Sequence, residues 1–175
     1  MLDQGSIFVF INFEQAARFG HIGWGFQLEE PGRYLFGSSD HLYRHHVLNL
    51  PGWLNYMAVP PGSDIDWWCH NGSESEMLTT MASGRHSASG RHLSYHAYKA
   101  IGVSKADPLK ARHTAESQAK GGWHLMNNNC VHQTYQILAD YGAAAVLPHP
   151  DSTPLRRIPK TWFAMLDGVT QLLPK

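Results

Sequence analysis

The sequence predicts an α+β domain, because its apolar segments are strand-like in the first half of the chain and mainly helical in the second half. Its 175 residues suffice for one domain with a hydrophobic core of its own. Hydrophobic residues make up 43% of the chain and charged residues 16%, as in globular rather than disordered proteins. We therefore expect a single domain over residues 1–175, with a C-terminal extension from about residue 148.

Charge and composition narrow the classes of partner. Lys+Arg and Asp+Glu number 14 each, so the formal net charge is zero, and we expect no nucleic acid partner. No stretch approaches the roughly 20 apolar residues of a membrane span, and we expect no membrane contact. The two cysteines, Cys69 and Cys130, are too few for a disulfide framework. Because no basic leader precedes the apolar run at 7–13, the chain as written is expected in the cytoplasm.

Three strands are predicted at the start of the chain, over 6–13, 21–28 and 33–40. The turn at 29–32 contains Pro and Gly, so the second and third strands should form a hairpin. In the second strand, the alternation of side chains puts His21 on the same face as Gly23 and Gly25. Two glycines on that face predict room above the sheet beside His21.

The register of this hairpin predicts a partner for His21. If Leu28 pairs with Arg33, Ser38 falls opposite Gly23 and Asp40 opposite His21. Asp40 could then accept a hydrogen bond from the imidazole and fix its tautomer. A slip of one residue would present Ser39 or His41 instead.

A capped helix carrying a cysteine is predicted after residue 128. Asn129 precedes apolar residues at helical spacing, and an asparagine amide oxygen can accept from the free N–H groups of a first turn. The helix should end near Gly142. Cys130 then lies in the first turn, where the helix N-terminus favours a thiolate. The backbone N–H of Cys130 could also donate a hydrogen bond to an oxyanion. Asn129 would either bind the oxyanion as well or position the helix start.

The remaining elements follow from local patterns. Strands are expected over 65–70 and 93–103, and strands broken by turns over 41–64. Ser73 and Glu76 form a capping box for a helix to about residue 82. Asp107 and Pro108 open a helix to about residue 120. A terminal helix should bury one apolar side, formed by Trp162, Phe163, Leu166, Val169, Leu172 and Leu173.

Two motifs resemble a known family. Gly5-Ser6 opens a strand that leads to Gly20-His21-Ile22-Gly23, and Asn129-Cys130-Val131-His132 stands at a helix start. Together, over residues 5–40 and 123–142, they resemble the NlpC-type branch of papain-like cysteine hydrolases, in the circularly permuted order in which the histidine strand comes first. That branch includes lecithin:retinol acyltransferase-like enzymes and bacterial peptidases, amidases and toxins. Gln133 stands where the acyltransferase-like members have an aromatic residue.

The resemblance implies a papain-like fold, with an antiparallel sheet packed against the cysteine helix, and a thiol hydrolase. Cys130 would be the nucleophile, His21 the base and Asp40 the orienting residue, with no cofactor or metal. The expected reaction is cleavage of an amide bond, with peptidoglycan peptides as the first choice of substrate. An exported enzyme of this kind would need a dedicated secretion system, as antibacterial effectors have, and a delivery or immunity partner that the sequence does not identify.

Two alternatives stay open at this point. One is acyl transfer or lipid ester hydrolysis of the lecithin:retinol acyltransferase-like type. The other is a non-catalytic binding module on the same fold, with a structural cysteine.

Other reactive side chains are interpreted as structural. His132 lies about 200° around the helix from Cys130 and should not face the sulfur. Cys69 is expected in the core, and adjacent strand residues such as Cys69 and His70 face opposite ways. No metal site is expected from the histidines with close spacing, which are His41, His45, His46, His92 and His96. Core positions are expected for Trp67, Trp68 and Trp162, whereas Trp53 could line a cleft.

Overall fold

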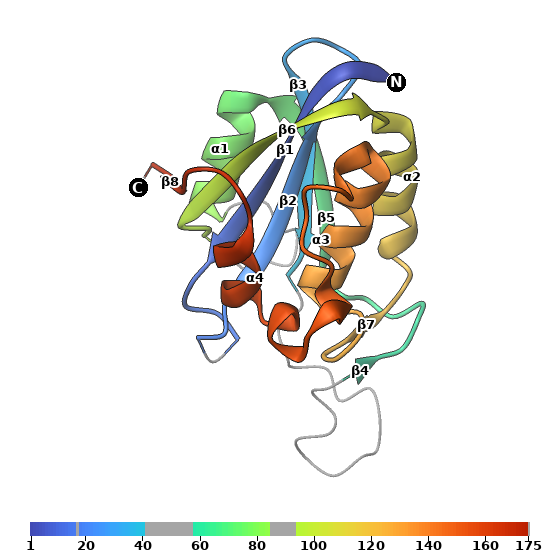
Figure 1. Cartoon of the computed structure of the whole chain (residues 1–175). Helices are drawn as coiled ribbons and strands as arrows, with labels where there is room; N and C mark the ends of the chain where they lie inside the picture. The colour runs from blue at the N-terminus through green and yellow to red at the C-terminus, as the bar shows by residue number, and fades with distance from the viewer. Residues whose placement is uncertain (17, 41–57, 85–93, 175) are drawn as a thin grey trace.

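The computed structural model describes residues 1–16, 18–40, 58–84 and 94–174. A six-stranded antiparallel sheet forms its centre, with the strand order β5-β3-β2-β1-β6-β8 (Figure 1). Its strands are β1 (Leu2–Asn12), β2 (His21–Gln27), β3 (Arg33–Ser39), β5 (Trp67–Ser73), β6 (Ala97–Ala106) and β8 (Gln171–Leu172). A second small sheet pairs β4 (Ala58–Val59) with β7 (Trp123–His124).

Helices cover both faces of the sheet (Figure 1). The α-helices are α1 (Glu74–Ser83), α2 (Pro108–Gln118), α3 (Cys130–Leu138) and α4 (Pro159–Met165). Short helical turns span Ala139–Ala143, Pro150–Ser152 and Pro154–Arg157. The α+β class and the antiparallel sheet predicted from the sequence are therefore confirmed.

The sheet separates two hydrophobic cores. On one face, the β2 side chains Ile22 and Trp24 pack with residues of α3 and α4, among them Val131 and Trp162. On the other face, β1 and β3 side chains pack against Met77 and Met81 of α1 and against Tyr95 and Tyr98. The cysteine helix therefore lies on the face of β2 opposite to the one that α1 covers.

Local sequence signals account for the helix starts. Ser73 accepts from the backbone N–H of Glu76 and the Glu76 carboxylate accepts from that of Ser73, as the capping box predicts. The side chain of Asp107 accepts from the N–H of Lys110 at 3.0 Å, with Pro108 as the first helical residue. These caps satisfy N–H groups that a helix start otherwise leaves unpaired.

The hairpin has the predicted register. Trp24 pairs with Gly37 and Gln27 with Tyr34, as expected when Leu28 faces Arg33. Because side chains alternate along both strands, this register brings Asp40 to the end of the sheet where β2 begins.

The glycine face of β2 is not open, contrary to the prediction. A Cβ on Gly23 would lie 2.6 Å from Cε of Met81 and 2.9 Å from Cζ of Tyr95, and one on Gly25 would lie 2.8 Å from Sδ of Met77. The missing side chains let α1 and Tyr95 approach the sheet closely. These glycines therefore make room for the core rather than for a substrate.

The predicted terminal helix is also wrong beyond its first two turns. α4 ends at Met165, and Gly168 has a φ of 95°, which starts a turn rather than another helical residue. The chain then forms β8, which pairs with the edge of β6. Val169 and Leu172 are consequently exposed, while Leu173 joins the core under α1.

The tail after residue 148 is built into the domain. Trp162 and Phe163 lie in the core of the α3 face, and Trp162 donates through Nε1 to the carbonyl of Pro148 at 2.7 Å. The buried Lys99 of β6 donates to the carbonyl of Leu166 at 2.6 Å. In the described part of the chain, no helix has the length and apolar character needed to cross a membrane.

The close approach at Gly23 gives a stability prediction. Gly23→Ala should lower the free energy of unfolding by about 1–3 kcal/mol, because the new methyl group overlaps with Met81 and Tyr95. Gly102→Ala, at a strand glycine with no atom within 4 Å of a new Cβ, is the matched control and should cost nothing. Equal stabilities in urea denaturation would contradict the tight packing between α1 and the sheet.

Candidate active site

Cys130 begins α3, and its neighbour Asn129 caps the helix. The side-chain oxygen of Asn129 accepts from the N–H of Val131 at 2.9 Å and from that of His132 at 3.3 Å. The N–H of Cys130 has no hydrogen-bond partner among the described residues, so it remains available as a donor beside its own sulfur. Cys130 is 6% exposed and borders a cavity.

His21 begins β2, and one of its ring nitrogens is fully engaged. Nε2 lies 2.9 Å from Oγ of Ser38 and 3.3 Å from Oδ1 of Asp40. The Ser38 hydroxyl donates to the carbonyl of Ile22, so toward His21 it acts as an acceptor. Both partners therefore accept, and Nε2 must carry a proton.

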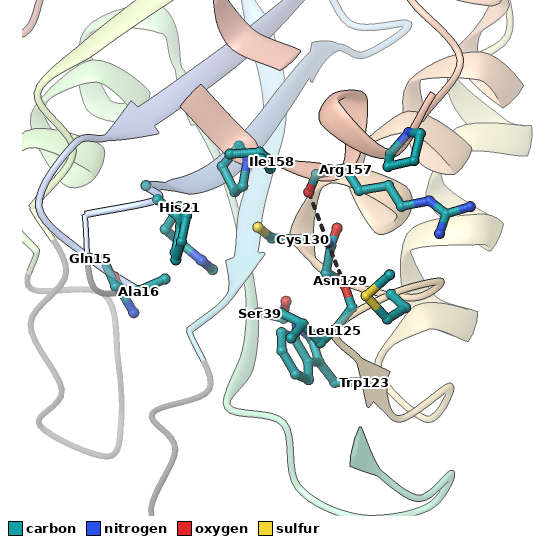
Figure 2. Close-up of a pocket in the computed structure, with 15 residues that line it drawn as sticks. Gln15, Ala16, His21, Ser39, Trp123, Leu125, Asn129, Cys130, Arg157 and Ile158 are labelled. Carbon is teal, nitrogen blue, oxygen red and sulfur yellow. Dashed lines mark hydrogen bonds between the residues drawn. The ribbon is translucent and has the colours of Figure 1, made fainter. Parts of the chain in front are cut away.

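This tautomer leaves Nδ1 of His21 for Cys130. Figure 2 shows the Cys130 sulfur pointing from the start of α3 toward the side of the cavity where the His21 ring lies. Burial alone would lower the pKa of His21, but the negative charge of Cys130, the hydrogen bonds with Asp40 and Cys130 and the charge of Asp40 together raise it to about 10. These contacts favour the imidazolium form of His21.

Asp40 is completely buried and is held by donors from β5 and from the segment before β6. Trp68 of β5 donates through Nε1 to Oδ2 at 2.8 Å, and the hydroxyl of Tyr95 donates to Oδ1 at 3.2 Å. Burial and the charge of Asp40 raise the pKa of Tyr95 well above its ordinary value, so Tyr95 remains a hydroxyl donor. A buried carboxylate needs such partners to remain ionised.

The other residues predicted as possible partners of His21 make different contacts. Ser38 shares the proton on Nε2 with Asp40. Ser39 instead donates to the side-chain oxygen of Gln133 at 2.6 Å, and Gln133 donates to the carbonyl of Gly122 at 3.1 Å. Gln133 therefore joins β3 to the cysteine helix. His41 lies outside the described residues.

The side chain of Asn129, predicted as an oxyanion or positioning residue, has both of its N–H groups engaged by backbone carbonyls. Its Nδ2 donates to the carbonyl of Leu125 at 2.9 Å and to that of Arg157 at 3.0 Å, which uses both of its N–H groups. One amide thus fixes the helix start, the turn before it and the tail. Of the two groups predicted to donate to an oxyanion, only the backbone N–H of Cys130 lacks a hydrogen-bond partner among the described residues.

His132 faces away from the sulfur, as predicted. Its Nδ1 lies 2.9 Å from the side-chain oxygen of Asn129, and its Nε2 lies 3.3 Å from Oδ1 of Asp151. Burial lowers the pKa of His132. Asp151 also pairs with Arg157 at 3.1 Å, so His132 helps to attach the tail to α3.

A cavity of about 270 Å³ lies beside Cys130 and His21 (Figure 2). Its described walls come from residues 15–21 before and at the start of β2, from Ser39 at the end of β3, from residues 123–130 before and at the start of α3, and from residues 154–159 of the tail. Most of the side chains that line it are apolar. The tail, for which the sequence offered no site motif, therefore forms part of the candidate site.

Cys69 does not lie in the core, contrary to the prediction. It is exposed on β5, the edge strand of the sheet. Partial burial and the negative charge of Glu116 raise its pKa. Cys69 is therefore a natural internal reference for the reactivity of Cys130.

The remaining predictions concern the tryptophans and the histidines. Trp67, Trp68 and Trp162 pack in the cores as expected, and Trp68 in addition binds Asp40. Trp53, His45, His46 and His92 lie outside the described residues. The ring of His96 accepts from the N–H of Phe13 at 2.9 Å. Within the described ranges, no group of three His, Cys, Asp or Glu side chains could hold a metal ion.

The coupling between His21 and Cys130 can be tested by titration. We expect the imidazole of His21 to remain protonated at pH 8, and Cys130→Ala to lower its pKa because the charge and hydrogen bond of Cys130 are lost. Nuclear magnetic resonance of the ring nitrogens would follow both proteins. The Cys69→Ala protein is the control, and an identical His21 titration in all three would disprove the coupling.

The amide of Asn129 can be tested by an isosteric change. Asn129→Asp keeps the acceptor for the helix N–H groups but turns an oxygen toward the carbonyls of Leu125 and Arg157. We expect the free energy of unfolding to fall by about 1–3 kcal/mol, because two buried acceptors lose their donor. Asn127→Asp, at an exposed position two residues earlier, should change it by no more than about 0.5 kcal/mol. A similar loss in both variants would contradict the role of Asn129.

Comparison of the chain with protein-family models, with curated proteins and with solved structures gave no match. The resemblance to the permuted NlpC-type hydrolases therefore stays a prediction.

Proposed function

We propose that this protein is a thiol hydrolase with a papain-like arrangement, in which Cys130 is the nucleophile and His21 the general base and acid. The observation that carries the proposal is the position of the His21 ring, with Nε2 bound to Ser38 and Asp40 and its other nitrogen left for the sulfur. A nucleophile, a base and an orienting acceptor in this order form the constellation that acyl transfer through a thiol requires.

The proposed reaction has two steps. The Cys130 thiolate attacks the carbonyl carbon of an amide, and the resulting oxyanion accepts a hydrogen bond from the backbone N–H of Cys130. The C–N bond then breaks, the amine takes the proton from His21, and a thioester remains. In the second step His21 accepts a proton from water, the resulting hydroxide attacks the thioester, and the C–S bond breaks to release the acid and the thiolate.

Asp40 and Ser38 act through His21. By accepting the proton on Nε2, they hold the ring in one orientation, and the negative charge of Asp40 favours the imidazolium that forms during the reaction. Peptidoglycan peptides are the substrate that the family resemblance suggests, and no residue of the site selects them by itself.

A second candidate function is acyl transfer or lipid ester hydrolysis. The mainly apolar walls of the cavity favour it, because a fatty acyl group would be desolvated there. Gln133 weighs against it, since this residue links Ser39 to Gly122 where the acyltransferase-like enzymes have an aromatic side chain. Incubation with phospholipids and with peptidoglycan fragments, followed by mass spectrometry of the products, would separate the two.

Alkylation tests the hydrolase against a non-catalytic binding module. With iodoacetamide near pH 7, Cys130 should be modified faster than Cys69, although Cys130 is buried and Cys69 exposed. His21→Ala should slow the modification of Cys130 and leave that of Cys69 unchanged. Cys130→Ala and His21→Ala should each abolish turnover of any substrate found, with Cys69→Ala as the active control. Slow labelling of Cys130 in the unchanged protein would favour the binding module.

A further inference from the structure

One wall of the cavity is a rigid turn with apolar side chains at its tip. His124 and Asn128 exchange backbone hydrogen bonds of 3.1 and 2.9 Å, and the N–H of Met126 donates to the ring of His124 at 3.2 Å. Such turns usually carry Gly, Asn, Asp or Ser. Here Leu125 and Met126 occupy the tip and line the cavity, although they are 38% and 44% exposed.

The turn is attached to the start of the cysteine helix. The carbonyl of Leu125 accepts from Asn129, the residue that caps α3. The backbone of Leu125 is therefore tied to the residue that precedes Cys130. Exposed apolar side chains on a fixed frame beside a nucleophile indicate a surface that a ligand covers.

The cavity offers little to a charged ligand. His21 and Arg157 are the charged side chains among the described residues that line it. Arg157 pairs through Nη2 with Asp151 at 3.1 Å, while its buried Nε has no hydrogen-bond partner among the described residues, and His21 is engaged with Asp40. Among the described lining residues, a basic substrate group would find no carboxylate, and an acidic group would find only cations that already have a carboxylate partner.

The position of His21 decides which part of a substrate meets the apolar turn. In Figure 2, the His21 ring lies to the left of the Cys130 sulfur, and Leu125 and Trp123 lie below the sulfur, toward the right of the view. The leaving amine must receive its proton from His21 and so lies on the His21 side. The group attached to the carbonyl carbon then extends toward Leu125, Met126 and Trp123.

We propose that this cavity is a specificity pocket for an uncharged, bulky apolar side chain on the acyl side of the cleaved amide, such as that of a leucine-, methionine- or phenylalanine-like residue. The inference rests on the proposed thiol chemistry and not on the peptidoglycan expectation. The volume of about 270 Å³ lies below the roughly 300–1,000 Å³ of pockets for drug-sized ligands, so a compact side chain is accommodated better than a long fatty acyl chain.

Covalent probes that differ only in the acyl group test the pocket. The full-length Cys69→Ala protein is treated with N-acetyl-aminoacyl chloromethyl ketones of Leu, Phe, Ala, Glu and Lys and with octanoyl chloromethyl ketone. The second-order rate constant for covalent modification is measured for each probe by intact-protein mass spectrometry. We expect the Leu and Phe probes to react roughly 10-fold or more faster than the Ala, Glu and Lys probes. Iodoacetamide, which does not fill the pocket, measures thiol activation separately.

Substitutions in the turn provide the matched test. Leu125→Glu and Met126→Glu should each slow the Leu probe roughly 10-fold more than they slow iodoacetamide, whose rate reports any change in thiol activation. Leu155→Glu is the control, because Leu155 is 63% exposed on the neighbouring tail and does not line the cavity. Circular dichroism confirms folding of each variant.

Each negative result would contradict a different part of the two proposals. Fast reaction with iodoacetamide but equal rates for all side chains, or preference for the Glu probe, would overturn the pocket and leave the hydrolase intact. A faster rate for the octanoyl probe than for the Leu probe would overturn the assignment to a peptide side chain. Slow reaction of Cys130 with iodoacetamide and all probes would overturn the hydrolase and the pocket with it.

Discussion

The completely buried carboxylate of Asp40 is the constraint around which the candidate site is arranged. An ionised carboxylate without partners would be very costly in a protein interior. Here Trp68 and Tyr95 donate to it, and His21 supplies a third contact. These donors come from β5, from the segment before β6, and from β2, so the sheet must assemble before the carboxylate is satisfied. The same requirement that stabilises Asp40 therefore fixes the orientation of the His21 ring.

Asn129 has the corresponding role on the other side of the cavity. It is buried, and all of its polar atoms are used, two donors toward carbonyls and one oxygen toward the first turn of α3. Asp40 thus holds the His21 ring, and Asn129 holds the helix that carries the sulfur. The position of the sulfur relative to the imidazole therefore depends on both residues. A site supported in this way can keep its geometry without help from a ligand.

Much of this site could be predicted because it depends on local rules. Alternation along 21–28 and the Pro-Gly turn fix the hairpin register, and that register brings Asp40 to His21. The asparagine before Cys130 predicts a helix cap, which the structure contains. Both conclusions need only neighbouring residues or one tight turn.

The errors all concern contacts between distant segments. Gly23 and Gly25 predict space on one face of β2, but alternation cannot tell that Met77 and Met81 fill it. The apolar spacing after Trp162 fits a helix, and only the free edge of β6 explains why β8 forms instead. Cys69 has an apolar neighbourhood in sequence, but its exposure follows from β5 being an edge strand. The donors to Asp40 and the tail residues at the cavity were missed for the same reason, since no local pattern links them to His21 or Cys130.

The tail wall of the cavity is held more firmly by Asn129 than by the charges around His132. The orientation of the Asn129 amide is fixed by four backbone partners, so its oxygen faces Nδ1 of His132, and that nitrogen must carry the proton. Nε2 of a neutral His132 then faces Asp151 without a proton.

Burial lowers the pKa of His132, so the neutral ring is the form favoured by folding. Its contribution to stability is present above its ordinary pKa of 6.5 and is lost as the pH falls through the lowered value. Acid would strengthen the contact with Asp151 but would charge a buried ring, and these effects oppose each other. The backbone carbonyl of Arg157, which Asn129 binds at any of these pH values, is therefore the attachment that keeps residues 154–159 against the cavity.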